Sequence, residues 1–128
     1  MQSMGNDEEI SEDCKALRLV RSDWIKDNDK PSSIAFQDRR ESGAMSIFLE
    51  DDILNDGESV ENLLALWPNY RICYLTVGEL RSEFKQEIER KNIDEFPGHA
   101  LVRDLSGKRS QGTRSRMAQK ARWYYQPD

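Results

Sequence analysis

Apolar and polar positions along the chain predict a series of short strands with brief helices between them. Four runs are rich in aliphatic, β-branched or aromatic side chains and are bounded by polar turns: residues 16–21, 44–49, 70–75 and 99–102. Runs of this length and composition are typical of β-strands. We therefore expect a sheet built around these four segments.

The first predicted helix covers residues 60–67. Ser59 precedes it as an N-cap residue, and Pro68 ends it. Its apolar side chains recur at i, i+3, i+4 and i+7, which places them on one face: Val60, Leu63, Leu64 and Trp67. We therefore expect Trp67 to lie in the core beside strand 70–75.

A second short helix is predicted over residues 77–84. Thr76 and Glu79 have the spacing of a capping box, in which each side chain accepts a hydrogen bond from the other residue's backbone N–H. Residues 85–93 fit either a continuation of this helix or a strand at the edge of the sheet.

A last helix is predicted over residues 113–125, before Pro127. It carries a narrow apolar stripe, with Arg116 and Lys120 on an adjacent face. Strands and helices alternate irregularly along the chain, which favours the α+β class over a doubly wound sheet. We expect a small mixed or antiparallel sheet with two to three helices, the C-terminal one basic.

The chain is predicted to form one domain preceded by a tail. Residues 1–13 hold few apolar side chains and a dense cluster of acids, so their burial cannot offset the entropy of ordering them. We expect a disordered acidic tail over 1–13 and a single domain over 14–128, a common domain size.

Membrane and export signals are not visible in the sequence. No apolar run reaches the roughly 18 residues of a membrane span, and the acidic N-terminus is unlike a secretory leader. Cys14 and Cys73 lie far apart without metal-ligand spacing, so we expect two thiols in a reducing cytoplasm rather than a disulfide. A membrane is not among the expected partners.

Charge is distributed unevenly along the 128 residues. The net charge is −5, yet residues 1–62 carry 16 acids and 7 bases, whereas residues 103–128 carry 2 acids and 7 bases. Such a separation of charge along one chain indicates a polar interaction surface.

The basic C-terminal segment is the clearest candidate for binding. Glycines, hydroxyls and cations surround the predicted start of the last helix, where free N–H groups and the helix dipole attract anions. The candidate polyanion-binding residues are Lys108, Arg109, Arg114, Arg116 and Lys120. Nucleic-acid bases could stack on Trp123, Tyr124 or Tyr125. A docking face for a partner protein and a merely solvated basic helix are the other interpretations.

A phosphate loop of the nucleotide-binding type is excluded at Gly107-Lys108. Arg109 stands where Ser or Thr would bind Mg²⁺, and no glycine lies five residues before Gly107. The acidic run at residues 50–56 lacks the alternation of a calcium loop. We expect neither a metal nor a cofactor.

His99 is the one histidine, so catalysis by an imidazole would have to use it. An enzyme acting on a phosphate-bearing substrate would need His99 beside phosphate-gripping cations, for which the candidates are Arg18, Arg21, Lys108 and Arg109. Convergence of His99 with an early arginine and with Ser32 or Ser33 would support that hypothesis. Pro31-Ser32-Ser33 could contact a ligand, although ordinary turn chemistry also explains it.

Several short motifs along residues 17–123 resemble a set of small uncharacterised bacterial proteins to which no activity is assigned. The motifs are Leu19-Val20-Arg21, Trp24, Pro31-Ser32-Ser33-x-Ala35-Phe36, Met45-Ser46, Gly98-His99-Ala100, Lys108-Arg109 and Ala121-Arg122-Trp123. The resemblance implies a bacterial cytoplasmic protein. It assigns no role to any residue.

These observations favour a non-enzymatic interaction module. In this interpretation the basic C-terminal loop and helix dock on a partner protein or on nucleic acid. The alternative is a small enzyme that acts on a nucleotide or RNA, with His99 as its acid or base. The sequence does not determine the oligomeric state.

Overall fold

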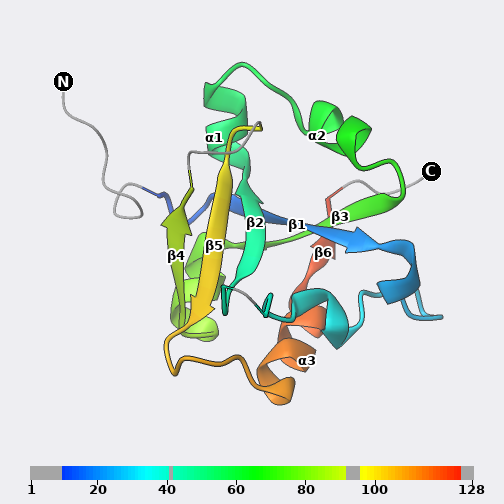
Figure 1. The fold of residues 1–128 in the computed structure, drawn as a ribbon, viewed down its shortest axis with the longest axis vertical. Coiled ribbons are helices and arrows are strands. Elements are labelled where there is room, and N and C mark those ends of the chain that lie inside the picture. The colour runs from blue at the N-terminus through cyan, green and yellow to red at the C-terminus, as the bar shows by residue number, and fades with distance from the viewer. Residues whose placement is uncertain (1–9, 41, 92–95, 125–128) are drawn as a thin grey trace.

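The computed structural model describes residues 10–40, 42–91 and 96–124, and Figure 1 shows their arrangement. One sheet of six strands runs through it in the order β4-β5-β2-β1-β3-β6, and every neighbouring pair is antiparallel. The strands are β1 (Lys15–Arg21), β2 (Met45–Leu49), β3 (Tyr70–Thr76), β4 (Gln86–Arg90), β5 (His99–Asp104) and β6 (Arg122–Trp123). The fold is therefore α+β.

Helical segments connect and cover these strands. The α-helices are α1 (Glu50–Asn55), α2 (Val60–Leu66) and α3 (Gln111–Lys120). Two 3₁₀ turns, η1 (Ser22–Trp24) and η2 (Ser33–Phe36), and one π-helical turn, η3 (Glu79–Glu83), complete the set. No helix among the described residues is long and apolar enough to cross a membrane.

The sheet separates two cores, because successive side chains along a strand point to opposite faces. The larger core lies where η2, η3 and α3 pack on one face, and Phe36, Leu80 and Met117 are buried there. The smaller core lies on the other face, where Ile53 of α1 and Leu63 of α2 cover β1 and β3. In Figure 1, α1 and α2 lie at the end of the molecule away from α3.

All four predicted strands are confirmed as β1, β2, β3 and β5, with bounds that differ by one or two residues. The capping residues are confirmed as well. The Ser59 hydroxyl accepts the backbone N–H of Asn62 at 3.1 Å. Thr76 and Glu79 form both bonds of the capping box, at 2.8 and 3.1 Å. Residues 85–93 fitted either a helix or an edge strand, and residues 86–90 form the edge strand β4.

One helix was not predicted, and another was predicted too long. Residues 50–55 form α1, and three acids in its first turn interact favourably with the helix dipole. The last helix ends at Lys120 rather than at residue 125, because Ala121 is extended and Arg122–Trp123 pair with β3 as β6. Tertiary pairing overrides local helix propensity at this point.

The predicted tail boundary also shifts. Residues 1–9 lie outside the described residues, but Ile10 is only 5% exposed and belongs to the larger core. The Arg81 guanidinium donates to the Ile10 carbonyl at 3.2 Å, and the Gly78 N–H donates to the Glu12 carbonyl at 2.9 Å. Residues 10–13 therefore belong to the packed domain rather than to a tail.

Cys14 and Cys73 are buried thiols that are not joined to each other. Burial raises the pKa of Cys14 to about 11 and the pKa of Cys73 to about 12. Both side chains therefore stay protonated at neutral pH and are poor nucleophiles.

Trp67 does not lie in the core as predicted. It follows the end of α2, is 40% exposed, and packs edge-on against Tyr70 with 5.4 Å between ring centroids. Trp67→Ala is therefore expected to lower the free energy of unfolding by only about 1 kcal/mol, the worth of such an aromatic contact. Urea unfolding measures this change, and a loss of about 3 kcal/mol or more, as for a core aromatic, would contradict the exposed position.

A candidate binding surface at the third helix

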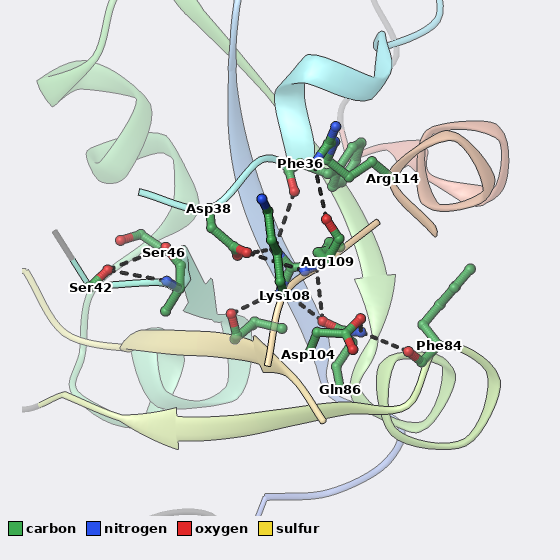
Figure 2. A network of polar contacts seen from close by, with 12 residues as sticks. Phe36, Asp38, Ser42, Ser46, Phe84, Gln86, Asp104, Lys108, Arg109 and Arg114 are labelled. Atoms are coloured by element: carbon green, nitrogen blue, oxygen red, sulfur yellow. Dashed lines mark hydrogen bonds and ion pairs between the residues drawn. The ribbon is translucent and has the colours of Figure 1, made fainter. Parts of the chain in front are cut away.

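The loop before α3 is fixed to the sheet by the guanidinium of Arg109, which is 1% exposed (Figure 2). Its Nε and Nη2 donate to the Gln86 side-chain oxygen at 3.0 and 2.7 Å. Nη2 also donates to the Val102 carbonyl at 3.0 Å, and Nη1 donates to the Phe36 carbonyl at 3.2 Å. The Asp38 carboxylate forms an ion pair with Nη1. The five-donor fork of arginine is well suited to bonding so many acceptors at once.

Gln86 extends this network across the edge of the sheet. Its amide nitrogen donates to the Phe84 carbonyl at 2.7 Å and to the Asp104 carboxylate at 2.9 Å. Burial lowers the pKa of Arg109, while Asp38 acts in the opposite direction. Arg109 is therefore a structural anchor with its donors engaged inside the protein. This corrects its assignment to the polyanion-binding group and to the phosphate-gripping group.

Arg114 and Arg116 lie on α3, and Lys108 lies in the loop before it. Lys108 and Arg116 are exposed, and the Arg116 guanidinium lies 5.9 Å from the centroid of the Phe84 ring. Arg114 is half-buried and donates to the Arg109 carbonyl at 3.1 Å and to the Gln111 side-chain oxygen at 2.7 Å. We call Lys108, Arg114 and Arg116 the basic surface around the start of α3; Arg114 and Arg116 are two positions apart on the helix and therefore point to different sides of it.

Lys120, the fifth candidate, is engaged by acids of η3. Its ammonium lies 3.3 Å from the Glu83 carboxylate and 3.9 Å from that of Glu79. Arg122 also pairs with Glu79, at 3.1 Å. Burial would raise the pKa of Glu79, but the Thr76 N–H and the two cations lower it below its usual value. Carboxylates of η3 thus balance the positive charges at the C-terminal end of α3. Within the described residues, the exposed cations at its start are not balanced in this way.

The aromatic residues after α3 are occupied within the protein. The Arg71 guanidinium lies 3.8 Å from the Trp123 ring centroid, and the Trp123 indole donates to the Asp29 carbonyl at 2.8 Å. Tyr124 packs edge-on against Tyr74 at 6.2 Å. Tyr125 lies outside the described residues. The rings of Trp123 and Tyr124 are therefore each already in contact with a cation of the protein, since the Lys15 ammonium lies 5.3 Å from the Tyr124 centroid.

His99 lies at the start of β5, and its Nε2 is 3.1 Å from the hydroxyl of Ser46. Strand register places it with Phe48 and Leu17 on the face of the smaller core. Arg18 points to the opposite face, where it donates to the carbonyls of Ala35 and Ser46 at 2.7 and 2.8 Å. Burial lowers the pKa of Arg18 to about 10, so it stays charged at neutral pH.

The convergence required by the enzyme hypothesis is not seen in the described residues. Arg18 and His99 lie on opposite faces of the sheet, and Arg21 pairs with Asp23 at 3.1 Å. Ser32 and Ser33 line a separate surface pocket to which His99 does not contribute. The serine that lies beside His99 is Ser46 of β2, not Ser32 or Ser33.

That pocket, of about 370 Å³, lies between the segment 26–33 and α3. Its lining residues are Lys26, Asn28, Lys30, Pro31, Ser32, Ser33, Ser115, Ala118 and Gln119. The sequence indicated Ser32 and Ser33 as possible ligand contacts but not this site, because α3 supplies one wall from more than 80 positions further along the chain. Within the described residues, no group of three or more His, Cys, Asp or Glu side chains could hold a metal ion.

Comparisons with known proteins found no relative of this chain: no family model, no curated protein and no solved structure matches it.

Proposed function

We propose that this chain is a non-catalytic interaction module that docks an acidic segment of a partner protein on its basic surface. The observation that carries the proposal is the Arg109 anchor (Figure 2). It holds the loop and the start of α3 against the sheet, which fixes the backbone that carries Lys108, Arg114 and Arg116, and the Arg109 carbonyl also holds the guanidinium of Arg114 at 3.1 Å. Pre-organised cations lose less entropy when they bind an anionic partner.

An acidic protein segment fits this surface better than nucleic acid does. Nucleic-acid binding gains most of its affinity from many phosphate contacts and from stacking. Lys120 is paired with Glu79 and Glu83, and Trp123 is covered by Arg71. The alternative of a phosphate-directed enzyme is less favoured, because His99 lies apart from Arg18, Ser32 and Ser33.

Binding to a fluorescein-labelled peptide of ten glutamates tests the proposal. Anisotropy should show binding in low salt that weakens as salt rises, since the contacts are solvent-exposed ion pairs. Arg116→Gln should weaken it about two- to fivefold, the worth of one exposed ion pair, and Lys108→Gln/Arg116→Gln should weaken it further. Lys91→Gln makes the same change of charge just after β4 and should leave the affinity unchanged.

A single-stranded DNA 12-mer with the same fluorescein label tests the competing hypothesis of a nucleic-acid partner. We expect it to bind more weakly than the peptide. If the DNA binds more tightly, and its affinity falls by close to one log unit per log of salt for each phosphate neutralised, the partner is nucleic acid. If neither probe binds below ~100 μM, within the range of nonspecific polyanion binding, the basic surface is only solvated.

A further inference from the structure

The pocket between the segment 26–33 and α3 is placed directly beside the basic surface. Ser115 and Gln119 line it from α3, which packs against η2, and Ser33 is the first residue of η2. In Figure 1, η2 and α3 lie next to each other at the end of the sheet away from α1. Pro31 and Ala118, both buried, are the apolar residues of an otherwise polar lining.

The segment that forms the outer wall is held by contacts on both sides. The Lys26 N–H donates to the Lys30 carbonyl at 2.7 Å, and an isolated β-bridge joins Ile25 to Pro31. Asp29, at the tip, has a φ of 64°, a left-handed conformation that costs energy in a residue other than glycine. Two contacts from the sheet stabilise this tip, the Trp123 indole on its carbonyl and Arg71 on its carboxylate, each at 2.8 Å.

The electrostatics of the pocket favour an anion. Its lining contains two lysines, three serine hydroxyls and two carboxamides, and no carboxylate. In the described part of the chain neither Lys26 nor Lys30 has an ion-pair partner. Of the two acids on the same segment, Asp29 is paired with Arg71, and Asp27 does not line the pocket. Two uncompensated ammonium groups beside hydroxyl donors match the charge and the acceptor oxygens of a phosphomonoester, which carries about −1.5 to −2 at pH 7.

A chain of hydrogen bonds connects the pocket to the basic surface. The Gln111 amide nitrogen donates to the Ser33 hydroxyl at 3.0 Å, and its oxygen accepts from Arg114 at 2.7 Å. An acidic segment that contacts Arg114 would therefore lie close to the pocket, whose wall includes Ser33.

We propose that this pocket binds the phosphate of a phosphorylated serine or threonine in the partner's acidic segment. Lys26 and Lys30 neutralise the phosphate, and the hydroxyls of Ser32, Ser33 and Ser115 donate to its oxygens. This inference rests on the proposed function for the surrounding segment, while the pocket itself recognises the phosphomonoester.

Titration of the ¹⁵N-labelled protein with O-phospho-L-serine tests the pocket directly. The backbone amides of Ser32, Ser33 and Ser115 should shift saturably at millimolar concentrations, a typical affinity for a ligand of this size, whereas L-serine should not shift them. Lys26→Gln/Lys30→Gln should weaken binding at least about tenfold, because it removes both charge-assisted contacts. Lys91→Gln should have no effect. No saturable shift up to about 10 mM, or a shift that Lys26→Gln/Lys30→Gln leaves unchanged, would overturn the proposal.

Inorganic phosphate distinguishes the source of the anion. Phosphoserine should bind more tightly than inorganic phosphate, because the serine body fills part of a pocket larger than the anion needs. Equal or tighter binding of inorganic phosphate would assign the pocket to the free ion and refute a phosphorylated side chain.

A pair of acidic ten-residue peptides, with and without a central phosphoserine, separates failure of this inference from failure of the proposed function. If both hold, the phosphate strengthens binding, and Lys26→Gln/Lys30→Gln removes only that gain. If the docking surface fails, free phosphoserine still binds but the unphosphorylated peptide does not. If the pocket fails, both peptides bind equally and only Lys108→Gln/Arg116→Gln weakens them.

Discussion

Arg109→Met is expected to lower the free energy of unfolding by about 3–5 kcal/mol, the usual loss when one partner of a buried ion pair is removed. Methionine fills much of the volume but leaves the carboxylate of Asp38 without its cation and removes the Arg109 donors from the oxygens of Gln86, Phe36 and Val102. Urea unfolding followed by circular dichroism measures the change.

Two variants make this expectation specific. Lys108→Met, one residue away and exposed, should change the free energy by no more than about 0.5 kcal/mol. Adding Asp38→Asn to Arg109→Met should recover part of the loss, because it removes the uncompensated carboxylate. A loss below about 1 kcal/mol for Arg109→Met would mean that the network contributes little to stability.

Gly98→Ala is expected to destabilise the protein by about 2–5 kcal/mol. Gly98 has a φ of 92°, and a Cβ there would lie 2.8 Å from the carbonyl oxygen of Leu49 and 3.0 Å from Ile53. The Gly98 carbonyl also accepts the Leu49 N–H at 2.8 Å, so the backbone cannot easily move away. The substitution therefore combines backbone strain with a clash at the start of α1.

Gly57→Ala separates these two costs. Gly57 has a comparable φ of 81°, but a Cβ there would meet nothing within 4 Å. It should cost only the backbone strain, about 1–2 kcal/mol. The same urea experiment compares the two variants, and equal losses would show that the close approach of Gly98 to Leu49 is unimportant.

Local chemistry was sufficient to predict most strands and helix starts. The aliphatic and aromatic run at residues 70–75 has one favourable conformation, and its strand β3 is observed. The helix caps can be predicted because each capping bond joins residues only three positions apart, as for Ser59, Thr76 and Glu79. The helix at residues 50–55 was missed because only Ile53 is buried on it, which leaves almost no apolar periodicity to detect.

The candidate site was harder to predict because charge alone does not show where a side chain points. Arg109 and Lys108 are neighbours with the same charge, yet one is buried among acceptors and the other is exposed. Arg109 reaches Gln86 and Asp38, which lie 23 and 71 positions away in the chain. A sequence pattern spanning a few residues around Arg109 cannot indicate partners that far along the chain.

The sequence by itself determined the α+β class, the four main strands, the caps and the basic character of the C-terminal segment, because these depend on side chains close together in the chain. Only the tertiary structure decided that Arg109 is an anchor, that Trp123 pairs in β6, and that Lys26, Lys30 and Ser115 share a pocket. Those outcomes depend on which distant backbone acceptors and side chains meet when the sheet forms, and burial then determines which charges remain available to a partner.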